Sequence, residues 1–124
     1  MRKGVFTMAM ICAVAGLFAC GTKSFTQISQ KEAKQIMDSR SDIIILDVRT
    51  HEEFNGGHIK GAICVPVETI GSEPKELPDK SQTILVYCRS GRRSKAAAQK
   101  LSDLGYTDIR EFGGIITWEY GLAK

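Results

Sequence analysis

The fold is decided by residues 83–104, which read TILVYCRSGRRSKAAAQKLSDL. The first five, Thr83 to Tyr87, are apolar or β-branched, as in a buried strand, whereas Ser94 to Leu104 is Ala-rich with a helical repeat. Cys88 is therefore predicted to lie in a strand-to-helix turn, followed closely by three arginines and a glycine. Amides at a helix N-terminus lack intrahelical partners and carry partial positive charge, so a thiol there loses its proton readily and a bound anion is held. The stretch predicts a site for thiolate chemistry.

The flanking sequence alternates short apolar runs with helical patterns. The expected strands are residues 25–28, 43–46, 63–65, 83–87 and 107–112. Capping-box spacing opens helices after Ser29 and Thr50, a further helix covers 94–104, residues 113–114 form a turn, and 115–122 form a final helix. This alternation predicts an α/β domain with an open parallel sheet of about five strands and helices on both faces. Ligands of such sheets bind beyond the carboxyl ends of the strands, where Cys88 is expected.

The first twenty residues read as a secretory signal. Arg2 and Lys3 precede a long uncharged run that is too short for the ~20 apolar residues of a spanning helix. The end of this segment, LFACG at residues 17–21, resembles a bacterial lipobox, so we expect cleavage before Cys20 and lipidation of that cysteine. Phe18 departs from the lipobox pattern, which leaves open ordinary signal cleavage nearby or retention of the segment as an uncleaved anchor.

These boundaries define three parts: a signal at 1–20, a short tether at 21–24 and a folded domain at 25–124. An exported location in a bacterium, periplasmic and lipid-anchored to a membrane, follows from the signal. Loss of the signal leaves 15 basic residues against 14 acidic ones, a net charge of +1. That balance argues against nucleic acid as a partner.

Two cysteines, Cys64 and Cys88, remain in the folded domain. A pair in an exported domain suggests a disulfide, yet a disulfide would disable Cys88 as a nucleophile. We favour a buried thiol for Cys64, with the disulfide as the alternative.

Several motifs together resemble the rhodanese family in its small single-domain form, over residues 25–122. They are LDVR (46–49), EF (53–54), GHIKGA (57–62), VYCRSGRRS (86–94), LGY (104–106) and GG (113–114) with Trp118. The resemblance implies a rhodanese-like fold and sulfur transfer: a donor such as thiosulfate passes its outer sulfur to Cys88, and the persulfide passes it to cyanide, a small thiol or a thiol protein. It implies a monomer without cofactor, and the sequence has no metal-spaced Cys/His cluster.

The residues around Cys88 receive separate roles. Amides of the loop are expected to hold the transferred sulfur, and the arginines to orient the rest of the donor. The expected substrate-binding residues are Arg89, Ser90, Gly91, Arg92, Arg93 and Ser94, and among the arginines we favour Arg93 and then Arg89, by the resemblance. Asp47 and Arg49 are expected to tie loops together in support of the site.

Other polar and aromatic residues are interpreted as structural: His51 and His58 as parts of the scaffold, Trp118 as a packing residue.

Three alternatives compete with sulfur transfer. A phosphatase or arsenate reductase would also use a cysteine loop, but cysteine phosphatases carry Arg six residues after the nucleophile, where this chain has Ser94. A sulfur-carrier or partner-docking domain is the second alternative. The third is redox sensing through a Cys64–Cys88 disulfide.

Overall fold

The computed structural model describes residues 25–124. The predicted signal at 1–20, its Cys20 and the tether at 21–24 lie outside the described residues. Within the described part of the chain, no helix is long and apolar enough to cross a membrane.

The centre of the domain is a five-stranded sheet with the order β2-β6-β5-β3-β4, in which every pairing is parallel. The strands are β2 (Thr26–Gln27), β3 (Ile43–Asp47), β4 (Ile63–Cys64), β5 (Thr83–Cys88) and β6 (Ile109–Gly114). All six residues of the central strand β5 are buried, which explains why its sequence is continuously apolar rather than alternating. The predicted open parallel sheet is confirmed.

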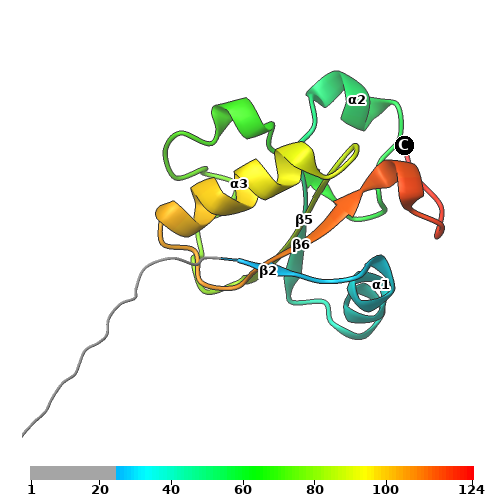
Figure 1. Cartoon of the computed structure of the whole chain (residues 1–124), viewed down its shortest axis with the longest axis horizontal. Helices are drawn as coiled ribbons and strands as arrows, with labels where there is room; N and C mark the ends of the chain where they lie inside the picture. Colours follow the sequence, from blue (N-terminus) through cyan, green and yellow to red (C-terminus); the bar gives the residue numbers. More distant parts are fainter. Residues whose placement is uncertain (1–24) are drawn as a thin grey trace, which may run out of the picture.

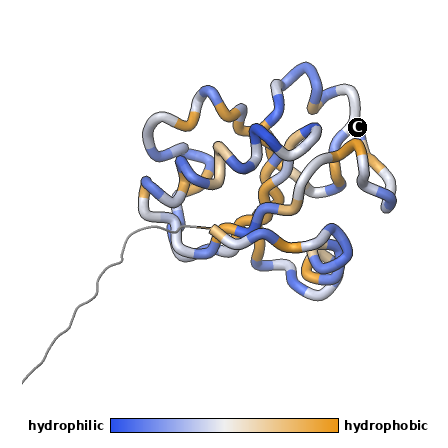
Figure 2. Tube along the Cα trace, in the orientation of Figure 1, coloured by the Kyte–Doolittle hydropathy of each residue, from blue (hydrophilic) through white to orange (hydrophobic). Residues whose placement is uncertain are grey.

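Helices cover both faces of the sheet (Figure 1). They are α1 (Gln30–Ser39), α2 (His51–Asn55) and α3 (Arg92–Asp103), with 3-10 turns η3 (Val67–Thr69) and η4 (Ile115–Thr117). One core lies under α3 and contains Ala97, Leu101 and Val86; the other lies under α1 and contains Ala33 and Leu85. Hydrophobic segments accordingly concentrate along the strands in Figure 2.

Capping boxes correctly locate two helix starts. The Ser29 hydroxyl accepts a hydrogen bond from the Glu32 amide at 3.0 Å at the start of α1. At α2, Thr50 and Glu53 form the full reciprocal box. Both helices therefore begin where the sequence places them.

Three predicted boundaries are wrong. Helix α3 begins at Arg92, two residues before Ser94, because Gly91 takes a left-handed conformation with φ +111° and turns the chain early. The expected turn at 113–114 is instead the end of β6. The expected helix at 115–122 is only the short turn η4, after which Trp118 is extended and residue 123 bridges back to His58.

Candidate active site

Cys88 ends β5 on the face covered by α3 and is only 1% exposed. The Gly91 amide donates a hydrogen bond to Cys88 Sγ at 3.0 Å, and the thiol lies 3.4 Å from Ser94 Oγ. The next amides begin α3, a helix of twelve residues, and so have no intrahelical acceptor. The buried sulfur thus accepts a hydrogen bond from one amide and lies at the positive end of a helix.

Glycine at the end of β6 lets this strand pack directly against the backbone of the cysteine loop. A Cβ on Gly114 would lie 2.2 Å from the Arg89 carbonyl oxygen and 2.6 Å from Ser90 Cα, so only glycine fits there. The Ile116 amide donates to the same Arg89 carbonyl at 3.2 Å. Register shifts between β5 and β6 at this point, which brings Gly114 opposite Cys88. The two glycines that looked like a turn therefore position the cysteine loop.

The loop arginines differ in their surroundings. Arg93 forms a bidentate ion pair with Glu53 of α2, with N–O distances of 2.8 and 3.0 Å. Hydrogen bonds from Arg93 lower the pKa of Glu53 to about 2, assisted by contacts with Thr50. Within residues 25–124, neither Arg89 nor Arg92 forms an ion pair.

A cavity of about 350 Å³ opens beside the loop. Its walls combine charged and apolar side chains: Arg49, Glu52, Glu53, Arg89, Ile115 and Leu122. Arg89 is the loop arginine that faces this cavity, and it is the one with a guanidinium free to bind an anion there.

Arg49 of the cavity wall forms a buried ion pair with Asp47. Arg49 Nη2 donates to Asp47 Oδ2 and to the Gly57 carbonyl, both at 2.7 Å. Asp47 Oδ1 also accepts from the Arg49 amide at 2.9 Å. The pair joins the end of β3 to the segment after α2.

Two residues of the site were not singled out from the sequence. Tyr87 accepts a hydrogen bond from the Ile59 amide at 3.0 Å, and burial raises the pKa of its phenol. Glu111 is 1% exposed, and its Oε2 accepts a hydrogen bond from the Ser94 hydroxyl at 2.5 Å. An acidic residue between the apolar Ile109 and Phe112 was the available signal for Glu111.

The remaining candidates lie in the scaffold. Cys64 is a free, half-buried thiol that donates to the Arg49 carbonyl at 3.5 Å, and burial raises its pKa to about 11. Cys88 is also free, so the two cysteines are not joined. The His58 ring stacks on Phe54 at 3.9 Å. Residues 25–124 contain no cluster of His, Cys, Asp or Glu arranged to hold a metal ion.

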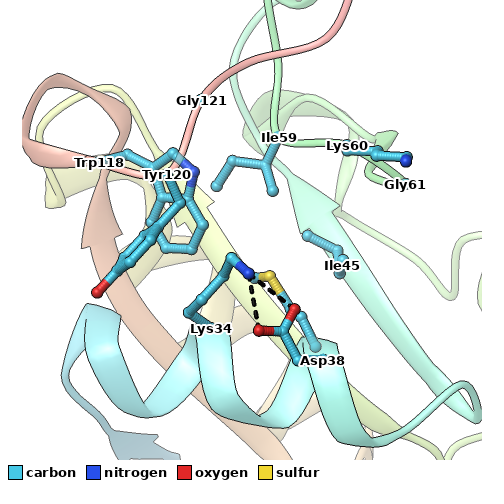
Figure 3. A pocket seen from close by; sticks show the side chains of 10 residues that line it. Lys34, Asp38, Ile45, Ile59, Lys60, Gly61, Trp118, Tyr120 and Gly121 are labelled. Carbon is cyan, nitrogen blue, oxygen red and sulfur yellow. Dashed lines mark hydrogen bonds and ion pairs between the residues drawn. The ribbon is translucent and has the colours of Figure 1, made fainter.

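A second cavity, of about 490 Å³, lies on the α1 face of the sheet (Figure 3). Trp118 and Tyr120 form one wall, Ile45 and Ile59 another, and the Lys34–Asp38 ion pair lies at its edge. Trp118 packs on Phe112 with ring centroids 5.6 Å apart, as expected of a packing residue. No residue of the cysteine loop lines this cavity, so it is separate from the candidate active site.

A buried cysteine held at a helix N-terminus, at the carboxyl edge of a parallel sheet, defines a cysteine-loop domain suited to anions and thiolate chemistry. Comparison with known proteins makes the class specific. The model of the Rhodanese-like domain matches residues 29–119. The chain belongs to the rhodanese family.

Individual relatives agree with this assignment. Thiosulfate sulfurtransferase PspE of Escherichia coli (strain K12) is 38% identical over 71 residues, which cover 56% of this chain and 68% of the relative. A sulfurtransferase of Allochromatium vinosum is 34% identical over 98 residues, covering 77% and 91%. A solved structure described as a rhodanese with anions from E. coli superimposes with a TM-score of 0.59 at 34% identity, covering 65% of this chain and 96% of that one.

Proposed function

We propose that the protein is a sulfurtransferase that moves the outer sulfur of a donor such as thiosulfate to a thiophilic acceptor. The observation that carries this proposal is the enclosed Cys88 thiol, 3.0 Å from the Gly91 amide at the start of α3. The Cys88 thiolate attacks the outer sulfur of thiosulfate; a Cys88–sulfur bond forms, the S–S bond of thiosulfate breaks, and sulfite leaves with the electron pair. Cyanide or a thiolate then attacks the outer persulfide sulfur, and Cys88 leaves as thiolate.

The residues of the loop have different roles in this reaction. Backbone amides from Ser90 to Ser94 surround the transferred sulfur, as one amide already does for the thiol. Arg89 binds the sulfite part of the donor from the adjoining cavity. Arg93 contributes a second guanidinium when the donor competes with Glu53 for it.

The geometry favours sulfur over phosphate as the transferred group. The position six residues after the cysteine holds Ser94, which is buried and bonded to the Glu111 carboxylate. The loop therefore lacks the arginine that a cysteine phosphatase supplies at this position. A phosphatase or arsenate reductase is therefore the weaker alternative, and hydrolysis of a phosphate ester that is lost in Cys88→Ser would favour it.

One observation supports a protein thiol as the acceptor. Ile116 and Leu122 are 60% and 59% exposed, and both lie beside the loop, Ile116 through its bond to the Arg89 carbonyl and Leu122 in the cavity wall. Exposed apolar side chains around a site mark contact surfaces for proteins. Slow turnover with cyanide but rapid transfer to one thiol protein would support this carrier role.

The test of sulfur transfer is intact mass after mixing with thiosulfate. We expect wild type to gain one sulfur atom and Cys88→Ser to gain none. Wild type without a gain would defeat the proposal, because the persulfide is its required intermediate.

We further propose, from the sequence of residues 1–21, that the chain is exported and lipid-anchored through Cys20. Growth of an expressing bacterium with a labelled fatty acid tests this directly. Label in wild type but not in Cys20→Ala supports lipidation, and equal absence of label from both refutes it.

A further inference from the structure

Glu111 is a carboxylate buried behind the cysteine loop, and within residues 25–124 it accepts hydrogen bonds but forms no ion pair. Its Oε2 accepts from Ser94 Oγ at 2.5 Å and from the Gly113 amide at 2.9 Å, and its Oε1 accepts from Gln27 Nε2 at 3.2 Å. None of the three donors carries a positive charge. Burying a carboxylate without a cation lowers the stability of the fold, and a well-packed apolar residue at this position would be more favourable for folding.

Ser94 connects this carboxylate to the reactive sulfur. Three acceptors lie within reach of Ser94 Oγ: Glu111 Oε2 at 2.5 Å, the Gly91 carbonyl at 3.0 Å and the Gly113 carbonyl at 3.4 Å. A serine hydroxyl has one proton, and the shortest contact, to a carboxylate, assigns that proton to Glu111. The lone pairs of Ser94 Oγ therefore face Cys88 Sγ, 3.4 Å away, where they accept the thiol proton. The three side chains form one directed chain from thiol to hydroxyl to carboxylate.

The hydrogen-bonded series of Cys88, Ser94 and Glu111 acts against the groups near the sulfur that favour the thiolate. The charged and titratable side chains on the elements around Cys88 are these: Arg89 of the loop; Arg92, Arg93, Lys95, Lys100 and Asp103 of α3; His51, Glu52 and Glu53 of α2; Glu68 of η3; Asp47 and Arg49 at the end of β3; and Arg110 and Glu111 of β6. The arginines and the helix N-terminus favour the thiolate. Hydrogen bonding to the neutral thiol and a negative charge nearby both disfavour it.

We propose that Glu111, acting through Ser94, is a positioning residue that sets the protonation of Cys88. It turns Ser94 into an acceptor for the thiol proton and places a carboxylate behind the sulfur, and both effects favour the thiol over the thiolate. The benefit is twofold: a thiolate of higher basicity is the stronger nucleophile, and a smaller thiolate fraction slows oxidation. The functional value of this balance between thiol and thiolate rests on the proposed sulfur transfer. The balance itself is a property of the free protein and can be measured without a sulfur donor.

The test is the pH profile of Cys88 alkylation by iodoacetamide, which needs no sulfur donor. Glu111→Gln keeps the shape and removes the charge; Gln27 can turn its amide to keep both groups bonded. The contacts of 3.4 and 2.5 Å place the carboxylate within about 6 Å of the sulfur, so we expect the half-maximal pH to fall by about one to two units. Glu119→Gln, an exposed position, changes net charge equally and should leave the profile in place.

A Glu111→Gln profile that coincides with wild type would overturn the proposal and leave Glu111 as a structural acceptor. If this variant does not fold, Ser94→Ala replaces it, because alanine cannot accept the thiol proton. For Ser94→Ala, a smaller fall in the half-maximal pH of alkylation supports the proposed role of Glu111, and an unchanged half-maximal pH refutes it. Sulfur loading by thiosulfate, measured separately, distinguishes a failure here from a failure of the proposed function.

Discussion

The Glu53–Arg93 ion pair should make folding stability depend on pH in the acid range. The pKa of Glu53 falls from its ordinary 4.5 to about 2, chiefly through the hydrogen bonds from Arg93. Because the folded pKa lies below the unfolded one, the stabilisation is complete above pH 4.5 and disappears as the pH falls through about 2. The replacement Glu53→Gln should remove this dependence, since glutamine keeps the capping interaction with Thr50 but carries no charge.

The size of the effect follows from the shift and from solvent exposure. At 1.36 kcal/mol per pKa unit, a change from 4.5 to about 2 corresponds to about 3.4 kcal/mol as an upper limit. The side chains of Arg93 and Glu53 are 31% and 29% exposed, so water and salt screen part of it. We expect Glu53→Gln to lower the free energy of unfolding by about 1–2 kcal/mol at pH 7.

Urea unfolding of wild type, Glu53→Gln and Glu52→Gln at several pH values checks this reasoning. Glu52 is the matched control, because it is exposed on the same helix and forms no ion pair within residues 25–124. The gap between wild type and Glu53→Gln should shrink to less than about half its pH 7 value by pH 3. Equal stabilities at pH 7, or a gap that stays constant down to pH 3, would refute the argument.

Three further outcomes are expected. Gly114→Ala should destabilise the fold by about 1–3 kcal/mol in urea and abolish sulfur loading, because its Cβ meets loop backbone, whereas Gly71→Ala, with nothing within 4 Å, should be neutral. Arg89→Gln should raise the KM for thiosulfate about tenfold in steady-state assays, and Arg92→Gln, which lies outside the cavity, should change it much less; equal effects would contradict the role of the cavity. Cys64→Ala should leave sulfur loading and oxidation behaviour unchanged by mass spectrometry, and altered oxidation would revive a disulfide sensor.

The sequence predicts well those features that depend on neighbouring residues. The strand that ends at Cys88 and the helix after it are recognised because continuous apolarity and a helical repeat are local patterns. Thr50 and Glu53 locate α2 because a capping box spans four consecutive positions. The order of elements then fixes the cysteine at the carboxyl edge of the sheet.

Contacts between distant segments could not be predicted in this way. Glu53 and Arg93 are 40 positions apart, and Ser94 and Glu111 are 17 apart on different elements. The wrong prediction of a helix at 115–122 has the same origin. Trp118 packs on Phe112, and Ala123 forms a β-bridge with His58. Tertiary contacts outweigh a weak local preference for helix there.

The charges around Cys88 fit a site that must bind an anion without holding it tightly. Glu53 neutralises Arg93 at the mouth of the site, and Glu111 places a negative charge behind the sulfur. Arg89 and Arg92 form no ion pair within residues 25–124, and of these two it is Arg89 that lines the adjoining cavity. In the proposed sulfur transfer, sulfite must leave before the acceptor arrives, and a loop in which all three arginines were uncompensated would retain it more strongly. The two carboxylates therefore have a common consequence: they lower the net positive charge around the sulfur.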